Sequence, residues 1–199
     1  MNKISIGIAN TFCPQPLFLF GTYDEDGNPN YSLVGWITYF NSGDYTSDKL
    51  HIVTCMSGKK LTRERLHSDK LFSVNLVTQS MLPVADYYGT VSGYNPDKMS
   101  VTVETVPGSV LNVPIIKESP WSFEVEVEQI LPFGQSDLFI CKVHNVMAFE
   151  ELLDNSLSME ERMRIASPVV TVGPHYFSVN PAPLGGWGAW RDKTREAFR

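Results

Sequence analysis

Short apolar and β-branched runs, separated by turn-forming residues, recur along most of the chain. Residues 17–23 and 31–40 are two such runs, and residues 24–28 between them contain Asp-Gly and Gly-Asn. Glycine and asparagine tolerate positive φ, so this arrangement predicts a β-hairpin. Further strands are predicted at residues 50–54, 71–77, 121–129, 138–149 and 169–172, the last of which is expected to be the final strand.

Residues 121–129 show the clearest two-residue alternation in the sequence. Apolar side chains fall on one face of this segment, namely Trp121, Phe123, Val125 and Val127. The intervening residues are polar or acidic, namely Ser122, Glu124, Glu126 and Glu128. Because successive side chains of a strand point to opposite faces, we predict a half-buried strand whose acidic face is exposed to solvent.

Helical signals are short and few. Residues 61–67 and 81–88 are predicted helices, and Ser158 with Glu161 forms a capping box at the start of a third. This third helix is expected to run to Ile165, before Pro168. Many short strands, few helices and no alternation of strands with long helices indicate a mainly β fold with short helices. We expect an antiparallel barrel or sandwich.

The composition is that of an ordinary folded protein. The chain has 199 residues, 43% of them hydrophobic, which is enough for one domain with its own core. We expect a single domain over 1–199, in which the glycine- and proline-rich start of 181–199 forms a C-terminal arm that packs on a second subunit. The net charge of −6 argues against nucleic-acid binding, which requires a basic surface.

Cysteine usage and the lack of targeting signals favour the cytoplasm. Cys13, Cys55 and Cys141 are widely spaced and form no C-x-x-C pair, which argues against a disulfide framework or a zinc site. The histidines are scattered as well, so no metal site is predicted. No apolar run approaches the roughly 20 residues that span a bilayer, and no secretory signal is visible at the start. We therefore expect no membrane contact.

Residues 57–62, with the sequence Ser-Gly-Lys-Lys-Leu-Thr, join a predicted strand to a predicted helix. The start of a helix has unpaired backbone N–H groups and a positive dipole end, which together suit a phosphate dianion. Lys59, Lys60 and Thr62 add two cations and a hydroxyl donor, and Gly58 lets the backbone approach a ligand closely. The alternative is a solvated basic turn that binds nothing.

Two other segments are candidates for binding. In residues 30–36 a glycine lies inside a strand pattern, which marks a close backbone approach, and Trp36 beside it offers a flat surface to a ring. The alternative is a core tryptophan next to a glycine that relieves crowding. Cys55 is either a reactive thiol or, as is commoner, a small buried side chain. Residues 89–98, which contain two glycines and Asn-Pro, are expected to form a loop.

Taken in this order, the segments resemble the flavin reductase-like, or flavoredoxin, family, whose fold is an antiparallel FMN-binding split β-barrel. That family carries a serine–glycine pair followed by an acidic residue and a lysine, and residues 92–98 contain this pattern. Residues 60–62 followed by 71–76 resemble its phosphate turn, helix and strand. Residues 113–120 resemble the segment that leads into its long strand. The resemblance extends over about residues 12–180.

The resemblance implies a homodimer that binds FMN non-covalently near the subunit interface. The implied flavin-binding residues are Asn30, Ser32, Trp36, Cys55, Met56, Ser57, Lys59, Lys60, Thr62, Ser92, Lys98, Tyr176 and Phe177. Among these, Asn30 and Trp36 are implied at the isoalloxazine ring. Residues 55–57 are implied to line the ring or the ribityl chain.

The same resemblance implies roles for the remaining residues. Lys59, Lys60 and Thr62 would hold the phosphate. Lys98 would lie near the ring, where a cation stabilises the negative charge of reduced flavin and raises its potential. Tyr176 or Phe177, near the end of the matched region, would cover the ring.

One segment departs from the family pattern. Relatives often have Gly-Asp-His before the second long strand, whereas this chain has Gly134, Gln135 and Ser136, so a serine replaces a titratable histidine. The resemblance implies an FMN-dependent oxidoreductase that passes electrons from NAD(P)H to flavin or to another acceptor. The missing histidine favours an alternative, an FMN electron carrier of the flavoredoxin type reduced by a protein donor. A non-catalytic split-barrel binding module is a third hypothesis.

Overall fold

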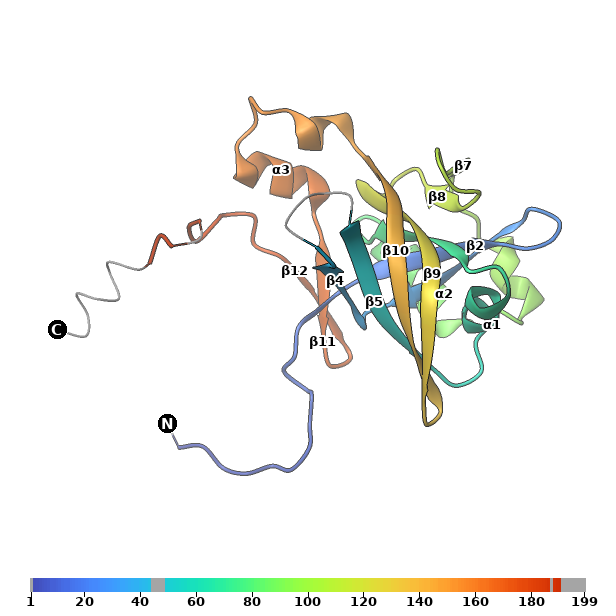
Figure 1. Ribbon diagram of the computed structural model, residues 1–199. Coiled ribbons are helices and arrows are strands. Elements are labelled where there is room, and N and C mark those ends of the chain that lie inside the picture. The colour runs from blue at the N-terminus through green and yellow to red at the C-terminus, as the bar shows by residue number, and fades with distance from the viewer. Residues whose placement is uncertain (1, 44–48, 187, 191–199) are drawn as a thin grey trace.

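The computed structural model describes residues 2–43, 49–186 and 188–190 (Figure 1). The strands are β1 (Gln15–Pro16), β2 (Phe18–Tyr23), β3 (Pro29–Val34), β4 (Ile37–Asn41), β5 (Leu50–Ser57), β6 (Leu71–Leu76), β7 (Thr105–Pro107), β8 (Pro114–Ile116), β9 (Trp121–Phe133), β10 (Ser136–Ala148), β11 (Val169–Val172) and β12 (His175–Ser178). The α-helices are α1 (Leu61–Ser68), α2 (Leu82–Thr90) and α3 (Met159–Ala166), and 3₁₀ turns occur at η2 (Pro96–Ser100) and η3 (Glu150–Leu153). No helix in these described ranges has the length and apolar character needed to cross a membrane.

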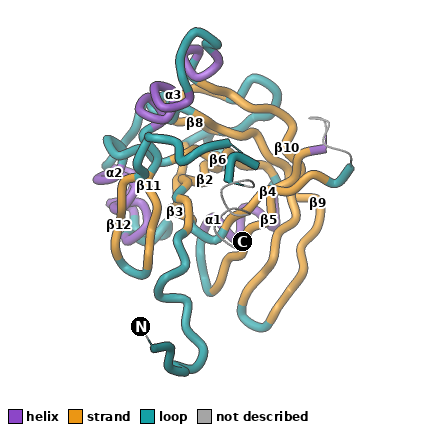
Figure 2. Tube along the Cα trace, turned by 90° about the vertical axis from the view of Figure 1, so that its left-hand side faces the viewer, coloured by secondary structure: helices purple, strands orange, loops and turns teal. Residues whose placement is uncertain are grey.

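Seven strands form one antiparallel sheet in the order β3-β2-β6-β9-β10-β5-β4. Figure 2 shows this sheet curled into an open barrel, and Figure 1 shows the long β9–β10 hairpin extending beyond it. A three-stranded sheet has the order β1-β11-β12, and β7 pairs with β8. The mainly β, antiparallel architecture expected from the sequence is therefore confirmed.

The core consists of two apolar clusters on opposite faces of β2. Phe20 belongs to the first cluster, which also contains Leu66 of α1, so α1 packs against that side of the sheet. Leu19, the neighbouring residue, belongs to the second cluster together with Ala85 of α2. Because adjacent residues of a strand point to opposite faces, β2 separates the two clusters and fixes both helices relative to the barrel.

The hairpin predicted around residues 24–28 is confirmed, but the run that follows it is not one strand. Asp24 accepts hydrogen bonds from the backbone N–H groups of Asp26 (3.1 Å) and Asn28 (2.7 Å), which closes the turn between β2 and β3. β3 ends at Val34, and β4 belongs to the opposite end of the seven-stranded sheet. The predicted run 31–40 is thus wrong as a single element, because strand propensity does not say which partner each half pairs with.

The solvated acidic face predicted for 121–129 is also wrong in part. Ser122 and Glu124 are fully buried, whereas Glu128 is exposed. The cause is the loop at 108–111, which folds over this part of β9. The Glu124 carboxylate accepts hydrogen bonds from the loop N–H groups of Ser109 (2.9 Å), Val110 (2.8 Å) and Leu111 (2.5 Å).

The chain continues beyond the strand that was expected to be the last. β12 follows β11 after a short turn and pairs with it in antiparallel register. All four residues of β12 are exposed, so this strand lacks the alternation by which strands are recognised. The predicted arm over 181–199 is described only at 181–186 and 188–190, where it forms neither helix nor strand. Its remaining residues lie outside the described ranges.

Candidate functional site

The largest concentration of predicted site residues lies around one cavity of about 550 Å³, within the range typical of small-molecule sites. We call it the Trp36 cavity. It is lined by Leu17, Ser32, Leu33, Val34, Gly35, Trp36, Cys55, Met56, Ser57, Lys60, Thr171 and Tyr176. Seven of the thirteen residues predicted from the sequence are in this lining, and they come from β3, the bend after it, β5, the start of α1 and β12.

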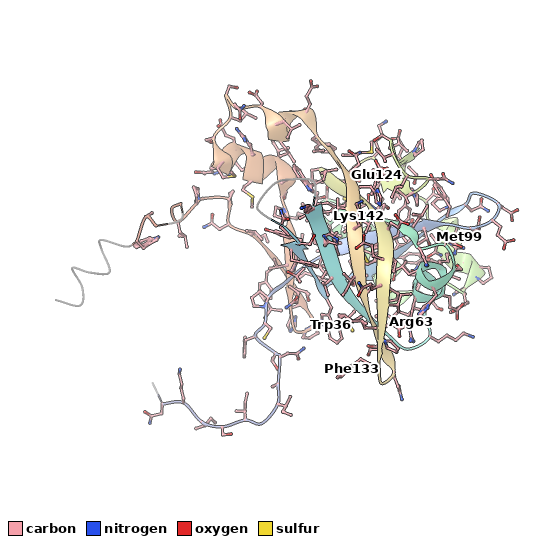
Figure 3. The ribbon with its side chains drawn as sticks, viewed as in Figure 1. Trp36, Arg63, Met99, Glu124, Phe133 and Lys142 are labelled. Carbon is pink, nitrogen blue, oxygen red and sulfur yellow. The ribbon has the colours of Figure 1, made fainter. Side chains whose placement is uncertain are left out.

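The bend between β3 and β4 sets the position of Trp36. Its backbone carbonyl accepts hydrogen bonds from the N–H of Cys55 (3.2 Å) and from the hydroxyl of Thr54 (2.9 Å), which ties the bend to β5. The Trp36 side chain is 56% exposed, so the tryptophan is not a core residue. An exposed indole at the mouth of a cavity is available to pack against a flat ring. Figure 3 shows Trp36 at the same end of the molecule as Arg63 and Phe133.

The end of β5 leads directly into the basic turn predicted from the sequence. Ser57 is bonded through its hydroxyl to the Ser136 hydroxyl on β10, with an O···O distance of 2.6 Å. Gly58 has φ of 71°, a conformation that favours glycine, and its N–H donates to the Gln135 carbonyl (3.2 Å). The turn is therefore pinned to the tip of the β9–β10 hairpin.

The start of α1 contributes Lys60 to the lining of the Trp36 cavity. Lys60 is the N-cap residue and its side chain makes no capping hydrogen bond. The first N–H to bond within the helix is that of Glu64, which donates to the Lys60 carbonyl (3.1 Å). The N–H groups before it, together with the Lys60 ammonium, make this helix start electropositive. Thr62 lies in the same turn but is buried.

A second cavity of about 470 Å³ adjoins the first, because Lys60 lines both. We call it the Lys59 cavity, and its lining also includes Gly58, Arg63, Glu64, His67 and Gln135. Lys59 lies with its ammonium 5.0 Å from the centre of the Tyr94 ring. The combination of cations and free N–H groups suits an anion.

Arg63 and His67 are functional candidates that sequence reasoning missed. Arg63 Nε and His67 Nε2 both donate to the same carboxylate oxygen of Asp137, at 2.6 and 2.7 Å. The Arg63 bond, and next the His67 bond, hold the pKa of Asp137 below its ordinary value. Arg63 also donates to the Gly58 carbonyl (2.9 Å), so the ion pair supports the basic turn. Residues 61–67 carried several charges, but only the fold brings Asp137 of β10 next to them.

Asn30 and Lys98 lie together in a third cavity of about 410 Å³, which we call the Lys98 cavity. Lys98 is only 3% exposed, and its ammonium donates to the Tyr88 carbonyl (2.9 Å). Burial, and secondarily the charge of Lys60, lower the pKa of Lys98 to about 8. Asn30 is equally buried, and its Oδ1 has no hydrogen-bond partner among the described residues.

The remaining predicted residues occupy different positions. Tyr176 lines the Trp36 cavity and its hydroxyl donates to Asp86 Oδ1 (2.6 Å). Phe177, the next residue of β12, is exposed and is not part of that lining. Ser92 is exposed in the loop before η2, where its hydroxyl accepts the N–H of Tyr94 (3.3 Å). Neither Ser92 nor Thr62 lines the three cavities.

The arrangement suits a ligand with a flat ring at one end and an anionic group at the other. The Trp36 cavity supplies an apolar wall, and the Lys59 cavity supplies the cations at its end. In the Lys98 cavity, the buried Asn30 oxygen has no hydrogen-bond partner among the described residues, and a ligand donor would satisfy it. The Lys98 ammonium there has one carbonyl acceptor and can donate to a ligand as well. These features fit a flavin mononucleotide.

The fold is similar to that of known flavoproteins. A flavoredoxin from Methanosarcina acetivorans matches with a TM-score of 0.81 and 24% identity, over 97% of this chain and 100% of that chain. The flavoredoxin of Desulfovibrio vulgaris (Miyazaki F) matches with a TM-score of 0.79 and 24% identity, over 94% and 99%. An FMN-binding protein from Thermus thermophilus matches with a TM-score of 0.73 and 19% identity, over 94% and 98%. The split-barrel fold expected from the sequence is thus confirmed.

Comparison of the sequence with known families gives a second result. No curated protein matches it. The family model described as flavin reductase like domain matches residues 10–168, which is most of the chain and includes every described strand from β1 to β10. The chain therefore belongs to the flavin reductase-like family.

Proposed function

We propose that this protein is an FMN-binding oxidoreductase that passes electrons from NAD(P)H to flavin or to another acceptor. The observation that carries the proposal is that Trp36 and Lys60, predicted for opposite ends of one ligand, line the same cavity. Membership of the flavin reductase-like family supports the same conclusion.

In this proposal the phosphate binds at the start of α1. Lys59 and Lys60 supply two ammonium groups, and the first turn of the helix adds backbone N–H groups with no partner within the helix. Charge-assisted bonds of this kind hold a dianion without covalent attachment. Arg63 is already bonded to Asp137, so it positions the turn through the Gly58 carbonyl.

The ring is proposed to lie against Trp36, with residues 55–57 along the cavity wall. Asn30 and Lys98 are the proposed polar partners of the ring, because both are buried. Asn30 Oδ1 has no partner among the described residues, and Lys98 Nζ has one carbonyl acceptor. When bound, FMN supplies one- and two-electron redox chemistry. A cation at Lys98 favours the reduced, negatively charged form, and its pKa of about 8 keeps most of the ammonium charged at neutral pH.

A specific observation favours the alternative of a flavoredoxin-type carrier reduced by a protein donor. Ser136, which stands where relatives often have a histidine, is bonded to Ser57 at the edge of the Trp36 cavity. A serine hydroxyl does not titrate near neutral pH and so cannot replace the proton-donating role of a histidine. Anaerobic mixing with NADH or NADPH separates the two functions. Prompt loss of flavin absorbance supports the reductase, and reduction only by a reduced protein carrier supports the alternative.

We also propose that the protein is a homodimer. Ile4, Ile6 and Ile8 alternate along the N-terminal segment and are exposed, which is the pattern of a strand without a partner. An apolar groove of about 540 Å³ is lined by Ile37 and Tyr39 of β4, the end strand of the large sheet. Addition of this segment from a second copy to the groove would bury both surfaces. Sedimentation of a variant with serine at all three isoleucines should show more monomer.

A matched control for the dimer removes three exposed apolar side chains elsewhere. Serine replaces Val110, Leu153 and Met159 in this control. If both triple variants sediment like the parent protein, the groove is not the dimer contact.

We further propose a single domain in a reducing compartment such as the cytoplasm. Cys13, Cys55 and Cys141, all within the described residues, are free thiols, which supports the compartment.

The direct test of the proposed function is FMN binding by the purified protein. A protein that stays colourless and shows no affinity for FMN would refute the flavin function. The Lys59→Ala/Lys60→Ala variant should bind FMN about 100-fold more weakly, since it loses two phosphate contacts. The Lys117→Ala/Lys142→Ala variant makes the same charge change away from the three cavities and should bind normally. Unchanged affinity in the first variant would place the phosphate elsewhere.

A further inference from the structure

The β11–β12 hairpin forms part of the wall of the Trp36 cavity. Thr171 and Tyr176 are directly paired across this hairpin, so their side chains lie on the same face. Both side chains line the cavity. The hairpin therefore contributes one cross-strand pair to the site, and its position decides whether that side of the cavity is closed.

The β11–β12 hairpin has few contacts with the rest of the protein. β12 is the end strand of a three-stranded sheet, and all of its residues are exposed. Within the described residues it pairs only with β11. Exposed terminal strands with few buried contacts open at low free-energy cost. A contact from β12 to the body of the protein consequently has a large influence on where the hairpin lies.

The contact that the structure provides is the hydrogen bond from the Tyr176 hydroxyl to Asp86 Oδ1, at 2.6 Å. Asp86 belongs to α2, which is anchored by the fully buried Ala85 before it and by the buried Tyr88. Burial, and next the bond to Asp86, raise the pKa of Tyr176 to about 12, so the hydroxyl keeps its proton at neutral pH. The Tyr176 hydroxyl can therefore donate at neutral pH, and its acceptor Asp86 is held in place by the packing of α2.

We infer that Asp86 is a positioning residue for the flavin cavity: by accepting the Tyr176 hydrogen bond it holds β12 closed over the Trp36 cavity and slows the entry and release of the flavin. The inference rests on the proposed flavin site for its ligand. It assigns Asp86 no contact with the flavin, since Asp86 is not part of the cavity lining.

Cys55 provides a reporter that does not depend on flavin. This thiol lines the Trp36 cavity, and Cys141 is fully buried. Replacement of the exposed Cys13 by serine leaves Cys55 as the accessible thiol. In the flavin-free protein, the rate at which an aromatic disulfide reagent modifies Cys55 then measures how often the cavity is open.

The test compares four variants in the Cys13→Ser background. Asp86→Ala and Tyr176→Phe should each raise the modification rate about tenfold, because each removes a hydrogen bond to a charged group. Asp86→Asn keeps an acceptor oxygen and should give an intermediate rate. Tyr87→Phe is the matched control, since it removes a tyrosine hydroxyl bond of the same helix, to the Asp97 carbonyl, and should leave the rate unchanged.

Two further measurements keep the outcome decisive. The double variant Asp86→Ala/Tyr176→Phe should react no faster than either single variant, because all three variants lose the same hydrogen bond. A rate increase equal to the product of the two single increases would mean that each substitution damages the structure independently, and would overturn the inference. Rates equal to that of the parent would overturn it as well. FMN should protect Cys55 from the reagent and should leave the Asp86→Ala protein about tenfold faster than the parent. Suppose that FMN fails to protect Cys55 while Asp86→Ala and Tyr176→Phe still raise the modification rate about tenfold. That result would count against the proposed flavin site and not against the Asp86–Tyr176 contact.

Discussion

Asn75 and Asn30 are both asparagines buried in strands of the same sheet, but their side chains differ in hydrogen bonding. The Asn75 amide donates to the Leu19 carbonyl (3.0 Å) and to the Ser73 hydroxyl (2.8 Å). Its oxygen accepts from the N–H of Ile116 (3.0 Å) and from the hydroxyl of Ser122 (2.9 Å). The Asn30 oxygen has no partner in the described residues, and its amide reaches only the Met99 sulfur at 3.9 Å.

Glu124 and Lys98 extend the comparison to buried charges. The Glu124 carboxylate accepts hydrogen bonds from three backbone N–H groups, the Ser109 hydroxyl and the Asn145 amide. Burial raises the pKa of Glu124, but these bonds outweigh it and the pKa lies below its ordinary value. Lys98 has one carbonyl acceptor and forms no ion pair with a carboxylate of the described residues.

The difference separates structural polar groups from functional ones. A buried polar group that is fully bonded stabilises the fold and has no capacity left for a ligand. A buried polar group with unmet bonds costs free energy in the free protein and recovers it when a ligand supplies the partner. Glu124 and Asn75 belong to the first kind, and Asn30 and Lys98 to the second.

The largest effect is expected at Glu124. Glu124→Ala removes the buried carboxylate that accepts all five of these hydrogen bonds, and the free energy of unfolding should fall by about 3 kcal/mol. Urea unfolding followed by tryptophan fluorescence measures this change. FMN affinity of the folded fraction should stay normal, since Glu124 does not line the three cavities. A loss smaller than that at an exposed carboxylate such as Glu150 would show that the five bonds are not formed in solution.

The two asparagines make the matched comparison. Asn75→Ala should lower the free energy of unfolding by about 2 kcal/mol, because it leaves buried backbone groups without partners. Asn30→Ala should cost less than about 1 kcal/mol, because its oxygen has no partner to lose among the residues that the structure describes. The affinity for FMN should respond in the opposite order, with a clear loss only for Asn30→Ala. Equal stability losses in urea unfolding would contradict the distinction between the two sites.

The smallest effect is a dependence of stability on pH that comes from Lys98. Its folded pKa of about 8 is below the value of 10.5 for a free lysine, so between these values the unfolded chain holds a proton that the folded protein has released. Stability therefore rises with pH over this range. Lys98→Met should abolish this rise. The free energy of unfolding of the parent and of Lys98→Met, measured at pH 7, 8, 9 and 10, tests this expectation. If the two proteins show the same change with pH, Lys98 is not buried in solution.

On the acid side of neutral pH, the dependence of stability on pH comes from carboxylates. The folded pKa of Glu124 is depressed, so its stabilisation is complete above the ordinary glutamate pKa of about 4.3 and is lost as pH falls through the folded value. Asp137 titrates in the same direction, because its pKa is also lowered. The parent protein should lose stability on acidification more steeply than Glu124→Gln. Identical slopes would assign the acid sensitivity to other carboxylates.

Much of the site could be predicted from local sequence, where the chemistry lies in one segment. The turn at 57–62 was recognised because a glycine, two lysines and a helix start are adjacent in the chain, and Trp36 because a glycine precedes it. Arg63 and Asp86 could not be found in this way. Each is defined by a partner 74 or 90 residues distant in sequence, Asp137 for the first and Tyr176 for the second. Glu124 was misassigned for the same reason, since alternation reports which face it occupies and not what covers that face.

The sequence by itself determined the local elements, namely the hairpin at 24–28, the starts of α1 and α3, and the mainly β character, because turn propensity, helix capping and side-chain alternation act between near neighbours. Contacts between distant segments set three other features: β3 and β4 part at Trp36, Glu124 is covered, and the Asn30 oxygen has no partner among the described residues. These outcomes depend on contacts between distant segments, whose free energies no local pattern contains.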